Sequence, residues 1–132
     1  GGYKLQGKTL DTAEQILEDA IALEDAGAFS IVLEVVPEPL AKLITEHISI
    51  PTIGIGAGKF CDGQVQVYHD LVGLFIDFYP KHAKRYGKLA DSIKESVEAY
   101  CNEVRSGEFP TDKQSYQMDP KILSEILKDK IP

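Results

Sequence analysis

Apolar side chains recur at helical spacing in the first part of the chain. Between residues 10 and 26 they fall three and four positions apart, which predicts an amphipathic helix. Asp11 and Glu14 are candidates for a capping pair at its start. Gly27 is expected to end the helix, because glycine readily adopts the left-handed conformation that follows a helix end. The apolar positions of this helix are Leu10, Ala13, Ile16, Leu17, Ala20, Ile21 and Leu23.

The apolar pattern then changes to that of strands. Residues 29–36 are rich in β-branched side chains and almost continuously apolar, which predicts a strand of a parallel sheet with both faces covered. A second short strand is predicted at 50–55, and a third at 64–69 from its β-branched content. Two prolines open a helix between the first two strands, over residues 37–47.

The second half of the chain carries the longest helical pattern. Residues from about 80 to 106 predict one long helix or two, and Gly107 stands beyond its end. The stretch 109–120 is polar and has little pattern, whereas 122–127 predicts a last amphipathic helix. The apolar stripe of the long helix contains Leu89, Ile93, Val97, Tyr100, Cys101 and Val104.

The order of these elements predicts an α/β fold with right-handed parallel crossovers. Two architectures fit this order. A flavodoxin-like open sheet usually needs about five strands. A (β/α)₈ TIM barrel takes about 250 residues. Because three barrel strands alone would leave two open edges, we expect the chain to be incomplete by itself.

The composition narrows the class of protein. The chain has 132 residues, of which 43% are hydrophobic and 27% charged, so one globular domain at most is expected. No apolar run approaches roughly 18 residues and the first residues lack a signal-peptide core, so we expect a cytoplasmic protein.

Cys61 and Cys101 are expected to be free thiols. The net charge of −7 disfavours a nucleic-acid partner. The small basic cluster Lys81, His82, Lys84 and Arg85 is interpreted as a solvated helix face.

Glu34 is the most informative candidate for chemistry. A carboxylate in the middle of an apolar strand is costly to desolvate unless a neighbour pairs with it or a reaction uses it. By strand alternation Glu34 shares a face with Val32 and Val36. It also lies near the carboxyl end of its strand, where parallel α/β proteins build their sites. From the residues alone, a structural Glu paired with a buried Lys or Arg fits equally well.

Two further groups of residues invite interpretation. The glycine-rich run 54–58 lacks the spacing of a dinucleotide fingerprint and the lysine of a Walker motif, so it is either a tight turn or a phosphate cradle. Cys61 and Asp62, together with His69 and Asp70, match no standard zinc spacing, so no metal site is expected from this chain alone. His69 and Asp70 are expected at a strand end, either in the site or in a structural bond.

Several blocks of the sequence resemble consecutive blocks of the ketopantoate hydroxymethyltransferase family. They are GGYKLQGKT at 1–9, LEDAGAFSIVLEVVPEPLAKLIT at 23–45, ISIPTIGIGAG at 48–58, CDGQVQVYHDLVGL at 61–74 and EVRSGEFP at 103–110. The order of the blocks makes the resemblance specific, although GIGAG alone would be weak. The likeness covers about the first 110 residues, and residues 117–132 follow no pattern of the family.

The resemblance implies the fold and the activity. The family folds as a (β/α)₈ TIM barrel, of which this chain would supply about the last three strands and their helices in residues 1–110. Residues 111–132 would form a tail with a short helix. The implied reaction transfers a hydroxymethyl group from 5,10-methylenetetrahydrofolate to 3-methyl-2-oxobutanoate. Its product, 2-dehydropantoate, leads to pantothenate and coenzyme A.

The resemblance also implies roles for residues and partners. Glu34 would be the general base, and Mg²⁺, held by ligands in the absent N-terminal half, would stabilise the enolate. Ile55, Val65 and Val67 would line the substrate's alkyl end, or else belong to the barrel core. A homo-oligomer is expected, with the long helix and the final helix as interface candidates. The alternatives are a non-catalytic half-barrel assembly module that needs the N-terminal half, and an unrelated barrel enzyme acting on phosphorylated substrates.

Overall fold

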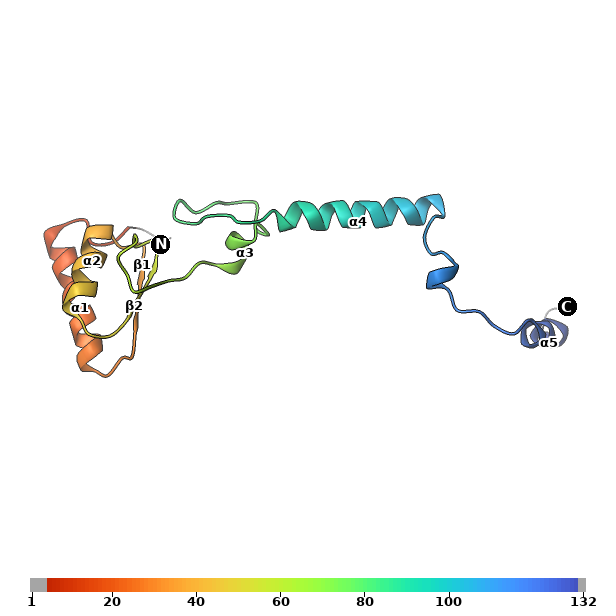
Figure 1. The fold of residues 1–132 in the computed structure, drawn as a ribbon, viewed down its shortest axis with the longest axis horizontal. Coiled ribbons are helices and arrows are strands. Elements are labelled where there is room, and N and C mark those ends of the chain that lie inside the picture. Colours follow the sequence, from red (N-terminus) through yellow and green to blue (C-terminus); the bar gives the residue numbers. More distant parts are fainter. Residues whose placement is uncertain (1–4, 131–132) are drawn as a thin grey trace. The chain divides into compact units, whose positions relative to one another are not determined.

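The computed structural model describes residues 5–130 (Figure 1). The first four residues of the GGYKLQGKT block lie outside the described residues. The chain divides into two units, residues 1–90 and 91–132. The division expected after residue 110 stays a prediction. The elements in order are α1 (Leu10–Asp25), β1 (Ile31–Glu34), α2 (Glu38–His47), β2 (Thr52–Ile55), β3 (Gly63–Gln64), α3 (Tyr68–Leu71), α4 (Leu89–Ser106), a 3₁₀ turn (Asp112–Gln114) and α5 (Pro120–Lys130).

The strands of the first unit form a parallel sheet in the order β1-β2-β3. In its register, Ile31 pairs with Thr52 and Glu34 with Ile55, while Ile53 pairs with Gly63. Helix α2 connects β1 to β2, as expected for a parallel crossover. The predicted α/β class with a parallel sheet is therefore confirmed, and the complete TIM barrel stays a prediction.

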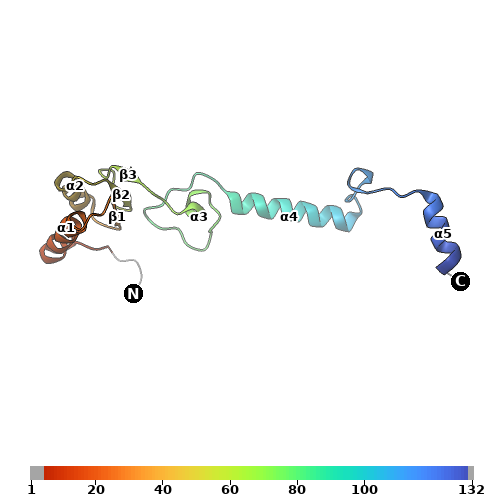
Figure 2. The ribbon, with the colours of Figure 1, turned by 90° about the horizontal axis from the view of Figure 1, so that it is seen from below.

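Helices α1 and α2 lie together on one side of the strands in both views of the ribbon (Figures 1 and 2). Burial along β1 alternates accordingly, because Ile31 and Leu33 are buried while Val32 is 59% exposed. No element within residues 5–130 covers the second face of β1, so the expected two-sided cover is not present in this part of the chain. The core consists of Ala20, Ile31, Leu33, Val36, Leu40, Ala41, Ile44, Ile48, Ala57 and Cys61.

Helix α1 confirms the predicted amphipathic helix, but its cap differs from the expected pair. Thr9 and Thr12 form the capping box, in which each hydroxyl accepts a hydrogen bond from the other residue's N–H, at 3.4 and 3.1 Å. The expected pair of Asp11 and Glu14 was wrong, because Asp11 already lies inside the helix. Gly27, with φ 89°, follows the helix end as predicted.

The third strand is shorter than predicted. Only Gly63 and Gln64 pair with β2, and the N–H of Val65 donates to the Gly54 carbonyl at 3.0 Å. Beyond Gly54 the chain of β2 turns away at Gly56, which has φ 69°, so no partner strand remains for the following residues. The β-branched residues of the predicted strand 64–69 therefore leave the sheet, and Tyr68–Leu71 forms the helical turn α3.

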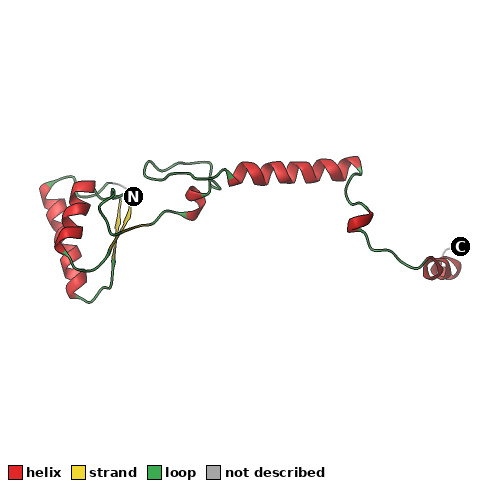
Figure 3. Cartoon of the chain, viewed as in Figure 1, coloured by secondary structure: helices red, strands yellow, loops and turns green. Residues whose placement is uncertain are grey.

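The long helix α4 begins at Leu89, not near residue 80 as predicted, and Figure 3 shows the segment between α3 and α4 as loop. The side chain of Gln66 accepts from the backbone N–H of Lys84 at 2.9 Å and donates to its carbonyl at 2.7 Å. Because these bonds engage both backbone groups of Lys84, they replace a helical pattern there. The interpretation of Lys81 and its neighbours as a helix face was wrong. Among the described residues, no helix is long and apolar enough to span a membrane.

Candidate active site

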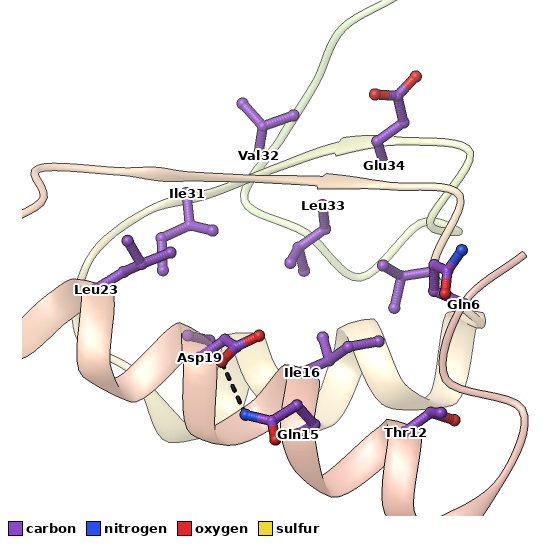
Figure 4. A pocket seen from close by; sticks show the side chains of 12 residues that line it. Gln6, Thr12, Gln15, Ile16, Asp19, Leu23, Ile31, Val32, Leu33 and Glu34 are labelled. Atoms are coloured by element: carbon purple, nitrogen blue, oxygen red, sulfur yellow. Dashed lines mark hydrogen bonds between the residues drawn. The ribbon is translucent and has the colours of Figure 1, made fainter. Parts of the chain in front are cut away.

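Glu34 lies at the carboxyl end of β1, on the uncovered side of the sheet. Figure 4 shows Val32 and Glu34 pointing away from α1, whereas Ile31 and Leu33 point toward that helix. The groove in this view has a volume of about 530 Å³ and is lined by residues of both α1 and β1. The Glu34 carboxylate points away from this groove and is exposed. Its chemistry therefore belongs to the opposite side of the sheet.

The residue after Glu34 interrupts the strand alternation. Val35 has φ 53°, a left-handed conformation that is uncommon for a β-branched residue and costs roughly 1–3 kcal/mol. Its N–H donates to the Ile55 carbonyl at 2.9 Å, and its carbonyl accepts from the Gln6 N–H at 3.3 Å. The turn sends Val36 into the core, where it is 6% exposed. The prediction that Glu34 and Val36 share a face was wrong for this reason.

A cavity of about 720 Å³ lies beside Glu34, within the first unit. Glu34, Ile55 and Val67, all singled out from the sequence, meet in its wall. Val65 is not among its lining residues and is 49% exposed. The carboxyl ends of β1 and β2 form one wall of the cavity, as expected for a parallel sheet. The complete lining is Glu34, Val35, Ile55, Val67, His69, Asp70, Phe75, Phe78, Pro80, Lys81 and His82.

The glycine-rich run beyond β2 is a tight turn. Gly56 and Gly58 have φ values of 69° and 80°. A Cβ at Gly56 would lie 2.9 Å from the ring of His82, and one at Gly58 would overlap Glu38. The close approach of these side chains explains why the run needs glycine. The acidic side chain of Glu38 beside Gly58 also disfavours a phosphate there, because like charges repel.

His69 and Asp70 lie in the helical turn α3, not at a strand end as predicted. Both line the cavity, and Asp70 is only 7% exposed. No group of three His, Cys, Asp or Glu residues in the described part of the chain is placed to hold a metal ion.

The loop between α3 and α4 supplies cavity residues that the sequence reasoning missed. Phe75, Phe78, Lys81 and His82 all line the cavity. Arg85 holds this loop together, because its guanidinium donates to the Phe75 carbonyl at 2.7 Å and lies 4.6 Å from the centre of the Tyr79 ring. The available signal was the aromatic content of residues 75–79, which is high for a segment without helical or strand periodicity.

Two carboxylates away from the cavity have lowered pKa values. The backbone N–H of Thr52 donates to the Asp62 carboxylate at 2.8 Å, and the Thr52 hydroxyl donates to the same oxygen at 3.1 Å. Both bonds lower the pKa of Asp62, and the backbone bond has the larger effect. The hydroxyl and then the backbone N–H of Ser49 lower the pKa of Glu24 in the same way. Since Thr52 is fully buried at the start of β2, its bonds to Asp62 fasten the glycine-rich turn to the sheet.

Comparison with known proteins gives a consistent result. The family model described as ketopantoate hydroxymethyltransferase matches residues 1–112. A protein of Dehalococcoides mccartyi named 3-methyl-2-oxobutanoate hydroxymethyltransferase is 59% identical over 127 residues, which are 96% of this chain and 46% of the relative. A protein of the same name from Clostridium acetobutylicum is 54% identical over 128 residues, which are 97% of this chain and 46% of the relative.

The chain thus spans about half the length of the curated relatives it matches. The expected extent of the likeness, about the first 110 residues, agrees with the residues that the family model matches. The alignments to the two relatives cover nearly the whole chain. The family model ends at residue 112, in agreement with the expectation for residues 117–132, although the two relatives also align with most of this tail.

Proposed function

The chain belongs to the ketopantoate hydroxymethyltransferase family, and from this premise we propose that it supplies the C-terminal part of an enzyme that hydroxymethylates 3-methyl-2-oxobutanoate. The one-carbon donor would be 5,10-methylenetetrahydrofolate and the product 2-dehydropantoate, on the way to pantothenate and coenzyme A. The observation that carries this proposal is the cavity of about 720 Å³ at the carboxyl ends of β1 and β2, with Glu34 in its wall. The names of the relatives favour a transferase over a non-catalytic assembly module.

In this proposal Glu34 is the general base. The reaction removes a proton from C3 of the 2-oxo acid, the carbon next to the ketone, and leaves an enolate. The enolate carbon then forms a bond to the methylene carbon of the folate while the bonds of that carbon to the two folate nitrogens break. Water supplies the hydroxyl group and tetrahydrofolate leaves, with the removed proton returned to its nitrogen. The position of Glu34 supports this role, because its carboxylate is exposed on the cavity side of the sheet and no protein group competes for it by an ion pair among the described residues.

Apolar residues beside Glu34 suit the alkyl end of the substrate. Ile55 pairs directly with Glu34 in the sheet register, and Val67 lines the same cavity. We propose that these two side chains contact the branched carbon chain of the 2-oxo acid. The proposal does not extend to Val65, which lies outside the cavity wall.

The Mg²⁺ of the proposed reaction, which would stabilise the enolate oxygen, is assigned to residues outside this chain. His69 and Asp70, which line the cavity, are not part of any three-residue cluster that fits a metal ion in residues 5–130. We therefore propose that the N-terminal portion of the barrel contributes the metal ligands, and that the complete active site forms only when both portions are present.

The proposal is tested by Glu34→Gln in the chain reconstituted with the N-terminal portion of a family member. Exchange of the C3 proton of 3-methyl-2-oxobutanoate with deuterium, followed by NMR in the presence of Mg²⁺, should fall by roughly 10²- to 10⁴-fold. Binding of the 2-oxo acid should persist, because the substitution keeps the shape of the side chain.

Glu46→Gln is the matched control, since Glu46 is exposed on α2 and makes only an exposed ion pair with Lys42 at 3.7 Å. This variant should exchange the proton at the wild-type rate. Undiminished exchange in Glu34→Gln would remove Glu34 from the base role. Absence of any folate-dependent turnover in the reconstituted wild-type protein would favour the assembly module instead.

A further inference from the structure

Val35 has a backbone conformation that valine seldom adopts. Within residues 5–130 it is the only residue other than glycine with a positive φ, at 53°. The left-handed region is unfavourable for a β-branched side chain, which crowds the backbone there. Such strain persists only where surrounding contacts impose it, and it gathers at functional sites. Val35 directly follows the proposed base and lines the same cavity, which indicates a role in the reaction.

Contacts from two other segments hold this conformation. The N–H of Val35 donates to the Ile55 carbonyl at 2.9 Å, and the Val35 carbonyl accepts from the Gln6 N–H at 3.3 Å. The segment of Gln6 is itself packed closely, because a Cβ at Gly7 would lie 2.6 Å from a methyl carbon of Leu40. The backbone of Val35 is therefore fixed between the end of β2 and the segment that precedes α1.

The left-handed turn decides what stands beside the Glu34 carboxylate. In a regular strand Val36 would lie on the same face as Glu34, about 7 Å along the strand. The turn places Val36 in the core instead, where it is 6% exposed. The face that carries Glu34 therefore ends at this residue, and no following strand side chain covers the carboxylate on the cavity side.

The turn alone does not require valine. Glycine would make it without strain, because glycine adopts positive and negative φ about equally well. A β-branched residue differs in that its side chain leaves the backbone and χ1 little freedom. Valine at this position therefore adds rigidity next to Glu34, at a cost in strain that a turn by itself would not need.

We propose that Val35 is a positioning residue for Glu34. Its rigid left-handed backbone fixes the direction in which the Glu34 carboxylate points, and so its distance to the C3 proton of the 2-oxo acid. A general base must lie within hydrogen-bond reach of the proton that it removes, and a misplacement of about 1 Å can slow a reaction roughly 100-fold. Val35 acts through Glu34, so the inference rests on the proposed function.

Val35→Gly in the reconstituted protein tests this role. Glycine adopts the left-handed conformation freely, so the variant should fold, but its backbone no longer holds Glu34 in one direction. The kcat of Mg²⁺-dependent exchange of the C3 proton should fall roughly tenfold. The KM for 3-methyl-2-oxobutanoate should stay unchanged, because binding of the 2-oxo acid does not depend on Val35. Exchange is followed by NMR at several substrate concentrations, and the thermal unfolding midpoint should not decrease.

Two further variants complete the experiment. Val35→Thr keeps the β-branched shape and should restore most of the exchange rate that Val35→Gly loses. Val65→Gly is the matched control, because Val65 is 49% exposed and does not line the cavity. It removes the same side chain from a neighbouring segment and should leave both kcat and KM at their wild-type values.

A wild-type kcat in Val35→Gly would overturn the inference. A raised KM with an unchanged kcat would overturn it as well, because Val35 would then contact the substrate itself. The same holds if Val35→Thr is as slow as Val35→Gly, or if the loss of kcat comes with a lower unfolding midpoint, since Val35 would then be merely structural. Failure of the proposed function is distinct, because the wild-type protein would then show no exchange.

Discussion

The backbone conformation of one residue, Val35, decides which side chains lie on the same face of the sheet as Glu34. Regular alternation predicts that Val32 and Val36 share its face, and this holds for Val32. The left-handed turn at Val35 reverses the next position, so that Val36 packs in the core instead. A run of β-branched residues does not predict such a turn, because valine disfavours positive φ. The hydrogen bonds of Val35 with Ile55 and Gln6 impose it.

At the same scale, the carboxylate of Asp62 predicts how stability depends on pH. Its pKa lies below the ordinary 3.8 in the folded chain, because Thr52 donates two hydrogen bonds to the charged form. The bonds therefore stabilise the fold above about pH 4 and are lost as the pH falls through the lowered pKa. Denaturant unfolding should show Asp62→Asn less stable than wild type near neutral pH, with the difference shrinking in acid.

Asp77→Asn provides the control for this measurement, since Asp77 is exposed and has no hydrogen-bond partner among the described residues. Its unfolding midpoint should follow that of the wild-type protein at every pH. A difference between Asp62→Asn and wild type that stays constant down to the most acidic condition would show that the ionised carboxylate contributes nothing.

Among the elements, helix α4 is amphipathic although its apolar side is not buried. Its predicted apolar stripe is present, yet none of its residues is buried. Ile93, Val97, Tyr100 and Val104 are 46%, 54%, 55% and 45% exposed. An exposed apolar stripe of this kind marks an interaction surface. We propose that α4 takes part in the expected homo-oligomer.

Val97→Asp tests this role, because a charge in the middle of the stripe would be desolvated in an interface. Light scattering coupled to size-exclusion chromatography should report a smaller assembly for the reconstituted variant than for the wild-type protein. Asn102→Asp adds the same charge away from the stripe and should leave the mass unchanged. An unaltered mass for Val97→Asp would exclude the stripe as the interface.

At the scale of the whole molecule, the sheet has an unpaired edge within residues 5–130. The amides of Ile31 and Val35 donate to the carbonyls of Pro51 and Ile55, at 2.9 Å each, so by alternation those of Val32 and Glu34 face the other edge of β1. Unpaired edges attract further strands. The relatives are about twice as long as this chain, which supports the proposal that an N-terminal strand pairs here.

Hydrogen exchange followed residue by residue checks this pairing. Adding the N-terminal portion of a family member should slow exchange of the Val32 and Glu34 amides at least about tenfold. The amides of Ile31 and Val35 serve as the internal control, because they already donate to the carbonyls of Pro51 and Ile55. If Val32 and Glu34 exchange equally fast with and without that portion, β1 is not the joining edge.

The sequence by itself determined the helices α1 and α2, the first two strands, their parallel arrangement and the family. These follow from apolar periodicity, from stop residues such as Gly27 and from the order of the blocks, all of which are visible in short stretches of chain. The same local signals placed Glu34 at the end of its strand, whereas the resemblance to the family supplied Ile55, Val65 and Val67 as candidates beside it.

Only the tertiary structure decided what surrounds Glu34. The β-branched residues after Gln64 favour a strand, but no partner strand lies there, so Asp70 enters the cavity wall from a helical turn. Gln66 engages the backbone of Lys84, which keeps residues 80–88 out of the helix and leaves Lys81 and His82 at the cavity. Such contacts join residues far apart in sequence, and their free energy outweighs the local preferences from which a sequence predicts structure.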